Sequence, residues 1–174
     1  MNDASTKPEP IFDLSSLNLP DLTESFFTDK QAANSDGEKF VVFFLEDALF
    51  AIPARLVTEV IRPIPFTPLP EAPSWLDGIA NLRGEVISVI NLLEFCQKKS
   101  APLSAKSKFI VLRPKNYNSA VAFPIDKLNE IVTLTKDEID SGSFSFFSGT
   151  ADYQSGSLYL LDTDKIFSSL LSGA

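Results

Sequence analysis

Arg83 is the residue of this chain whose setting best suits recognition chemistry. It lies in the segment 81–85 (NLRGE), between an apolar stretch and the β-branched run 86–90. This pattern predicts two strands joined by a tight turn, in which Gly84 supplies the backbone freedom where the chain reverses. A guanidinium held at the tip of such a rigid element presents fixed donors to the carboxylate or backbone of a partner. The segment therefore predicts a recognition site.

The composition removes most catalytic and metal chemistry. The 174 residues include no histidine and one cysteine, Cys96. Catalysis by Ser-His-Asp or Cys-His groups is excluded, as are zinc sites that contain histidine or only cysteines. No glycine-rich phosphate-binding pattern occurs, and no pair of carboxylates or lysines stands out. We expect a protein that is not an enzyme and that holds no cofactor and no metal ion.

Charge and hydropathy restrict the class of partner. The formal net charge is −8, and the chain shows no basic face of the kind that nucleic-acid binding requires. An acidic protein is also poorly suited to an anionic membrane surface. No apolar run approaches the ~18 residues of a spanning helix, and the polar N-terminus differs from a signal peptide. Together with the single cysteine, these features predict a cytoplasmic protein with no nucleic-acid partner and no direct membrane insertion.

Residues 1–37 are predicted to form an acidic, largely disordered N-terminal tail. They hold seven acidic residues and two lysines, a net charge of −5, and three prolines that interrupt regular structure. The tail also contains apolar residues that form a candidate docking motif: Phe12, Leu14, Leu17, Leu22, Phe26 and Phe27. One interpretation is a segment that folds on a partner. The others are a strap that packs on its own domain and a linker with incidental apolar residues.

The rest of the chain, residues 38–174, repeats itself at a nearly constant offset of 69 to 72 residues. The matched segments are 40–43 (FVVF) with 109–112 (FIVL), 51–53 (AIP) with 122–124 (AFP), 57–61 (VTEVI) with 128–132 (LNEIV), and 84–87 (GEVI) with 156–159 (GSLY). Several matches in the same order indicate two related halves, roughly 40–100 and 105–170. In this alignment Ser155 falls opposite Arg83, so the arginine is a feature of the first half alone.

Each half contains short apolar segments interrupted by Pro, Gly, Asn and Asp, which is typical of all-β barrels. A length of about 70 residues holds roughly five strands of ordinary length. Short helical turns are expected to close the halves at 92–95 and 164–167. The sequence therefore predicts an all-β fold of two barrels with short helices.

Residues 40–174 resemble the CheW domain, the coupling module of bacterial chemosensory arrays. The strongest part is 78–92 (GIANLRGEVISVINL), which is similar to the family pattern G-[IV]-x-N-L-R-G-x-[IV]-x-P-[IV]-[IVL]-[DN]-L. Supporting matches are 43–53, 57–60, 70–75 and 121–126. Two departures stand out: Ser88 replaces the proline that the family often has, and residues 150–155 are more polar than the resemblance implies.

The resemblance implies two SH3-like five-stranded barrels packed on a shared core. It also implies a non-enzymatic adaptor that couples chemoreceptors to a CheA-type histidine kinase in a chemosensory signalling array. The implied partners are the regulatory domain of that kinase and the tip of a methyl-accepting chemoreceptor, which would recruit the protein to membrane receptor arrays. The alternative is a CheW-like scaffold of a type IV pilus motility or phototaxis pathway, which binds a response regulator through its N-terminal tail.

By this resemblance, Arg83 lies near the groove that receives the receptor hairpin. Asn81, Leu82 and Gly84 belong to the same candidate partner-binding turn, and Asn81 and Gly84 are expected to shape it. The competing interpretation of Arg83 is a buried structural arginine paired with an acid such as Glu59. The two roles do not exclude each other.

A second candidate partner-binding surface contains Val57, Glu59 and Ile61. By resemblance, this stretch contributes to binding of the kinase regulatory domain. If the stretch is extended, these alternate residues share one face, and an exposed valine beside a charge suits a small protein contact. The alternative is a core valine beside a solvated glutamate.

Overall fold

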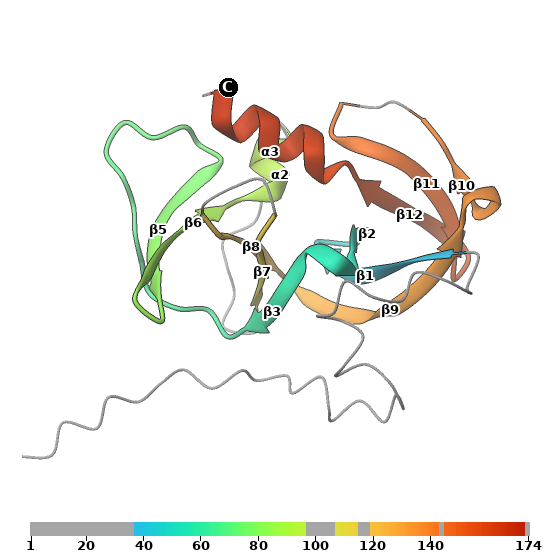
Figure 1. The fold of residues 1–174 in the computed structure, drawn as a ribbon, viewed down its shortest axis with the longest axis horizontal. Helices are drawn as coiled ribbons and strands as arrows, with labels where there is room; N and C mark the ends of the chain where they lie inside the picture. Colours follow the sequence, from blue (N-terminus) through green and yellow to red (C-terminus); the bar gives the residue numbers. More distant parts are fainter. Residues whose placement is uncertain (1–36, 97–106, 115–118, 143–144, 173–174) are drawn as a thin grey trace, which may run out of the picture.

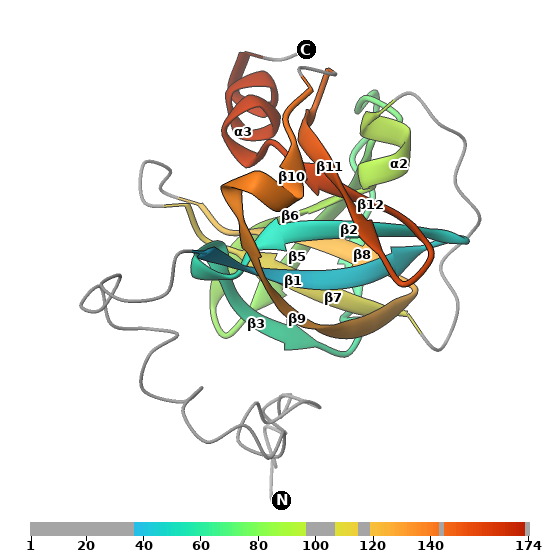
Figure 2. The ribbon, with the colours of Figure 1, turned by 90° about the vertical axis from the view of Figure 1, so that its right-hand side faces the viewer.

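The structure is a computed structural model of the chain, and it describes residues 37–96, 107–114, 119–142 and 145–172. The candidate docking motif of the tail lies outside the described residues. Gly37, which the sequence assigned to the tail, already begins the first strand. The described residues form two curved sheets and a few short helices, as Figure 1 and Figure 2 show.

The first sheet, called sheet A, has the strand order β10-β11-β12-β2-β1-β9. Its strands are β1 (Gly37–Leu45), β2 (Ala48–Pro53), β9 (Lys127–Thr135), β10 (Ile139–Asp140), β11 (Phe147–Tyr153) and β12 (Gly156–Leu161). All neighbouring strands are antiparallel except β12 and β2, which run parallel.

The second sheet, sheet B, repeats this plan with the order β4-β5-β6-β8-β7-β3. Its strands are β3 (Val57–Ile61), β4 (Phe66–Thr67), β5 (Leu76–Leu82), β6 (Glu85–Ile90), β7 (Lys108–Leu112) and β8 (Val121–Ile125). Here β6 and β8 form the one parallel pair. Each sheet therefore has five main strands and one two-residue strand, and the predicted all-β fold is confirmed.

Each sheet curls into a barrel because its two edge strands are consecutive in the chain. In sheet A, β9 and β10 are joined by the three-residue helix η3 (Lys136–Glu138). In sheet B, β3 and β4 are joined by residues 62–65. Such short links hold the two edges close together, so the sheet between them has to curve back on itself. The structures built on sheets A and B are called barrel A and barrel B below.

The barrels do not coincide with the two halves of the sequence. Sheet B takes all its strands from the continuous segment 57–125, whereas sheet A combines 37–53 with 127–161. The chain crosses between the sheets at η2 (Ala54–Leu56) and at Asp126. The structure thus corrects the division into barrels at roughly 40–100 and 105–170, because the first hairpin of each half pairs with the later strands of the other half.

The pairing register confirms the internal repeat and refines its offset. Phe40 pairs with Pro53 in one hairpin, and Phe109 pairs with Pro124 in the other, as the matched segments predict. The equivalent strands β12 and β6 also pair alike: β12 aligns on β2 as β6 aligns on β8, with an offset of 71 residues instead of 72.

The two longer helices follow the equivalent strands β6 and β12: α2 (Leu92–Phe95) comes after β6 and α3 (Thr163–Ser172) after β12. Asn91 accepts a 3.2 Å hydrogen bond from the backbone N–H of Glu94, and Asp162 accepts one of 3.1 Å from Lys165. These are N-cap bonds, which satisfy free N–H groups at the start of a helix. Both helices lie at the same end of the domain in Figure 1 and Figure 2.

The hydrophobic residues form one shared core and one smaller core in each barrel. The hairpins β1–β2 and β7–β8 contribute to two cores at once: Phe43 and Phe123 belong to the shared core, whereas Val42 lies in barrel A and Phe109 in barrel B. Both faces of these hairpins are therefore buried. This accounts for their unbroken apolar runs, since a half-exposed strand would alternate with polar residues.

Gly78 lies where β5 passes close to β4, and it predicts a large effect of a small substitution. Its φ is +153°, and a Cβ at this position would lie 2.4 Å from the backbone oxygen of Thr67. We expect Gly78→Ala to lower the free energy of unfolding by roughly 2–3 kcal/mol, because of backbone strain and a clash with main-chain atoms.

Gly84→Ala is the matched control for this prediction. Its φ is +89°, but a Cβ there would meet nothing within 4 Å, so the expected loss is only about 1 kcal/mol of backbone strain. Denaturant unfolding of the two variants makes the comparison. Equal losses at both positions would contradict the close approach at Gly78.

Candidate functional site

The turn that carries Arg83 is a two-residue hairpin loop between β5 and β6. Leu82 pairs with Glu85 across it, and Arg83 and Gly84 both have positive φ, 54° and 89°. These angles are typical of a type I′ turn. The side-chain oxygen of Asn81 accepts a 2.9 Å hydrogen bond from the backbone N–H of Gly84. Asn81 and Gly84 thus shape the turn as predicted, whereas a non-glycine residue at the Arg83 position is disfavoured by about 1 kcal/mol.

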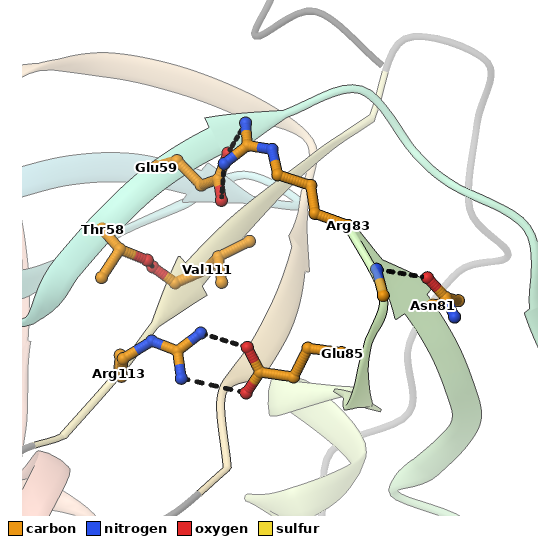
Figure 3. A network of polar contacts seen from close by, with 8 residues as sticks. Thr58, Glu59, Asn81, Arg83, Glu85, Val111 and Arg113 are labelled. Atoms are coloured by element: carbon orange, nitrogen blue, oxygen red, sulfur yellow. Dashed lines mark hydrogen bonds and ion pairs between the residues drawn. The ribbon is translucent and has the colours of Figure 1, made fainter. Parts of the chain in front are cut away.

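Arg83 forms a bidentate ion pair with Glu59 of β3, shown in Figure 3. Nη1 of Arg83 donates to Oε1 of Glu59 at 3.1 Å, and Nη2 donates to Oε2 at 2.8 Å. The side chain of Arg83 is 49% exposed and that of Glu59 is 17% exposed. Two parallel bonds fix the plane of the guanidinium, while about half of the side chain remains open to solvent. The structural pairing anticipated for Arg83 is therefore present, and it leaves the group accessible.

A β-bulge in β3 aims Glu59 at the turn. Val57 pairs with Leu112 and Glu59 pairs with Val111, so Thr58 is the extra residue on this strand. The hydroxyl of Thr58 donates to the backbone oxygen of Val111 at 3.0 Å. Bulges interrupt the alternation of side chains along a strand and redirect them. The predicted common face of residues 57, 59 and 61 is therefore broken.

Three of the predicted contact residues are buried in the domain itself. Val57 belongs to the shared core, and Ile61 and Leu82 belong to the core of barrel B. Their side chains offer no surface to a partner, which corrects the prediction and favours the core interpretation of Val57. The predicted residues that remain at the surface are Asn81, Arg83 and Gly84, with Glu59 partly exposed beside them.

A second bidentate ion pair lies beside the first, and sequence reasoning missed it. Nη1 of Arg113, which follows β7, donates to Oε1 of Glu85 at 2.9 Å, and Nη2 of Arg113 contacts Oε2 (Figure 3). The hydrogen bond from Arg113 lowers the pKa of Glu85, and the same bond raises the pKa of Arg113. The charge of Glu59 also raises the pKa of Arg113. The two ion pairs therefore form one electrostatic network.

Barrel A holds its equivalent turn without an ion pair. With the offset of 71, the counterparts of Glu59 and Arg83 are Glu130 and Gln154, so the predicted match of Arg83 with Ser155 is wrong by one residue. Glu130 accepts a hydrogen bond from the hydroxyl of Tyr153 and a 3.1 Å bond from the side chain of Gln154. This accounts for the polar character of residues 150–155, because polar side chains there hold the turn.

The environment of Tyr153 predicts that its hydroxyl ionises at a higher pH than that of an ordinary tyrosine. Partial burial, followed by the hydrogen bond to Glu130 and the charge of that residue, raises the pKa of Tyr153 to about 12. Because the unfolded chain loses this proton near the ordinary tyrosine pKa of ~10, the contribution of Tyr153 to stability is complete below that pH and falls between it and about 12.

Ultraviolet absorbance of tyrosinate measures this prediction directly. The chain has three tyrosines, and we expect one of them to ionise at a pH well above that of an unperturbed tyrosine. Tyr153→Phe should remove this ionisation step at high pH, and the free energy of unfolding should then decrease less at high pH. An ionisation step at high pH that survives in Tyr153→Phe would contradict the assignment.

Neither a metal cluster nor a membrane span is found in the part of the chain that the structure describes. Within those residues, no three His, Cys, Asp or Glu side chains are grouped so as to hold a metal ion. No helix among them is long and apolar enough to cross a bilayer. Cys96 follows α2 and is partly buried.

The proteins that resemble this chain include two chemotaxis proteins and a scaffolding protein of known structure. The chemotaxis protein CheW of Helicobacter pylori is 32% identical over 112 residues, which cover 64% of this chain and, at 66%, just under two thirds of that protein. The chemotaxis protein CheW of Treponema pallidum is 28% identical over 149 residues, covering 79% of this chain and 86% of that protein. The crystal structure of the scaffolding protein TtCheW from Thermoanaerobacter tengcongensis shares the fold, with a TM-score of 0.65, 24% identity, and coverage of 72% of this chain and 88% of that one.

A family model also matches most of the chain. The model described as the CheW-like domain matches residues 39–171, from within β1 to the last turn of α3. This range includes both barrels, the shared core and both ion pairs of the charged network. The resemblance based on the NLRG segment and its supporting matches is thereby confirmed: the chain belongs to the CheW-like domain family.

Proposed function

We propose that this chain is a non-enzymatic adaptor that couples chemoreceptors to a CheA-type histidine kinase in a chemosensory signalling array. The observation that carries the proposal is the CheW-like domain match over residues 39–171. Relatives named chemotaxis protein CheW support the same role. The partners would be the regulatory domain of the kinase and the tip of a methyl-accepting chemoreceptor, and the receptor would recruit the protein to membrane arrays.

We assign the receptor contact to the turn of barrel B. Its arginine is fixed by Glu59 and is still 49% exposed, so N–H groups that do not face Glu59 remain for a carboxylate or a carbonyl of a partner. The corresponding turn of barrel A carries the neutral Gln154. Two barrels of one plan with different turns suit an adaptor, because each can bind a different protein.

The proposed kinase contact has a smaller set of candidate side chains than the sequence predicted. Of Val57, Glu59 and Ile61, only Glu59 is not buried: its side chain is 17% exposed, whereas Val57 is 8% exposed and Ile61 is 2% exposed. Since Glu59 already holds Arg83, a change at this residue should alter both the turn and any contact made by β3. Replacements at Glu59 therefore do not distinguish an effect on receptor binding from an effect on kinase binding. Replacements at Arg83 affect mainly the turn.

Binding of the full chain to two purified probes tests the proposal. The probes are the regulatory domain of a CheA-type kinase and a cytoplasmic receptor fragment that includes the tip, both from the same organism as the chain. Isothermal titration calorimetry should give a saturable complex with each probe. Absence of binding to both folded probes would overturn the proposed function.

The alternative pathway depends on the acidic tail. If the chain serves a type IV pilus or phototaxis pathway, residues 1–36 would bind a response regulator through the apolar residues Phe12 to Phe27. Removal of these residues should then abolish binding to the regulator and leave binding to the kinase domain intact. Unchanged binding to every candidate regulator would remove the tail from the proposal.

A further inference from the structure

The four residues of the charged network connect the β5–β6 hairpin to β3 and to the end of β7, which form no backbone ladder with this hairpin. In the order of sheet B, β7 and β8 separate β3 from β6, so the β5–β6 hairpin makes no ladder with β3. Figure 3 shows Arg83 and Glu85 reaching from the hairpin to Glu59 on β3 and to Arg113 at the end of β7. The orientation of the turn on this side of the barrel therefore depends on side chains.

The hairpin and the strands that face it each carry one positive and one negative side chain of the network. The hairpin supplies a cation and an anion two residues apart, Arg83 and Glu85, and the facing strands supply Glu59 and Arg113. Each carboxylate receives two bonds from one guanidinium. Glu85 is thus held on the side of β7, away from Arg83.

Loss of Arg113 would leave the carboxylate of Glu85 without its ion-pair partner, close to Arg83. Glu85 is 37% exposed and lies two residues from Arg83 in the chain. A carboxylate without its own cation competes for the donors of a nearby guanidinium. Arg83 would then be shared between two carboxylates, with fewer donors and less positive charge for a third one on a partner.

Barrel A shows that the second ion pair is not needed to build a barrel of this plan. The positions equivalent to Glu85 and Arg113 are occupied there by Gly156 and Phe44. Barrel A nevertheless curls in the same way and holds its turn through Glu130. The Arg113–Glu85 pair is therefore an addition specific to the barrel that carries Arg83.

From this geometry we infer that Arg113 is a positioning residue for partner binding: it occupies Glu85 and so keeps the guanidinium of Arg83 available. The inference rests on the proposed receptor contact of Arg83, which it deepens. Arg113 does not itself touch the partner in this account. Its effect is transmitted through Glu85, and removal of the negative charge of Glu85 should make Arg113 dispensable.

The capture of Arg83 by Glu85 is measurable without any partner. NMR titration of the Glu85 carboxyl carbon in the full chain reports its pKa. In wild type, Arg83→Ala should leave the pKa of Glu85 nearly unchanged, because Arg113 holds this carboxylate. In the Arg113→Ala background, Arg83→Ala should raise the pKa of Glu85 further. If Arg83→Ala has no effect in that background, Arg83 is not captured and the inference is overturned.

Binding to the receptor fragment tests the consequence. We expect Arg113→Ala to weaken binding by roughly tenfold and the double variant Arg113→Ala/Glu85→Gln to recover most of the wild-type affinity. Lys108→Ala is the matched control, because it removes a cation from β7, the strand that Arg113 follows. Lys108 forms no ion pair with another described residue. Wild-type affinity in Arg113→Ala, or a double variant as weak as the single one, would overturn the inference.

The two measurements separate this inference from the proposed function. If wild type binds neither the receptor fragment nor the kinase domain, the proposed function fails. The NMR titration then still decides whether Arg113 keeps Glu85 from Arg83. If wild type binds and only the predictions for Arg113 fail, the proposed function stands without the positioning role.

Discussion

Replacement of Phe123 by alanine is expected to lower the free energy of unfolding of the whole domain by roughly 3–5 kcal/mol. Phe123 lies in β8 and is fully buried in the shared core. Its removal leaves a cavity that two packed sheets fill only in part. Because the shared core contains residues of both barrels, the loss should destabilise both barrels together. A domain of ordinary stability, about 5–15 kcal/mol, would be left marginal.

Two probes of unfolding test this expectation. Circular dichroism reports both sheets, and the fluorescence of Trp75, which packs edge-on against Phe95 at 5.5 Å, reports the packing near α2. The two transitions should coincide in wild type and in Phe123→Ala, at a lower midpoint in the variant. Val86→Ala is the control: this side chain is 60% exposed, so the change should stay within about 0.5 kcal/mol. Two separate transitions in wild type would contradict the shared core.

Arg83→Glu is expected to weaken binding of the receptor fragment by about 100-fold while the domain stays folded. The substitution removes the exposed guanidinium and places a second carboxylate beside Glu59. The loss of a half-exposed ion pair and the new repulsion should cost only about 1–2 kcal/mol of stability. Titration calorimetry gives the affinity, and denaturant unfolding shows that the fold is retained.

Gln154→Glu is the matched control for the charge change. Gln154 occupies the same position in the type I′ turn of barrel A, next to Glu130, so the variant introduces the same like-charge pair into the same local structure. The two variants should lose similar amounts of stability, and only Arg83→Glu should lose binding. If Arg83→Glu binds as wild type, or if Gln154→Glu loses as much, the turn of barrel B is not the recognition element.

Local features of this chain were predictable because they depend on neighbouring residues. The NLRGE turn is an example: the amide side chain of Asn81 and the freedom of Gly84 determine it within five residues. The repeat was visible for the same reason, since related halves carry related strands and turns. Even the pairing of Arg83 with Glu59 was one of two interpretations that the charges alone suggested.

The predictions that failed concern features that depend on contacts between distant segments. The hairpins at residues 37–53 and 108–125 have similar apolar runs, so the sequence does not show which set of later strands each one joins. The bulge at Thr58 shifts one residue out of register and sends Val57 into the shared core. Arg113 and Glu85 are 28 residues apart and meet only because β7 and β6 flank β8.

The most direct test of the adaptor role is whether the chain holds both partners at once. The receptor fragment is immobilised, the full chain is bound to it, and the kinase regulatory domain is then added while bound mass is followed by interferometry. We expect the regulatory domain to add mass only when the chain is present, and we expect Arg83→Glu to prevent this because the variant does not stay bound to the receptor. Displacement of the chain by the regulatory domain, or no added mass on a chain-saturated receptor, would contradict the adaptor role.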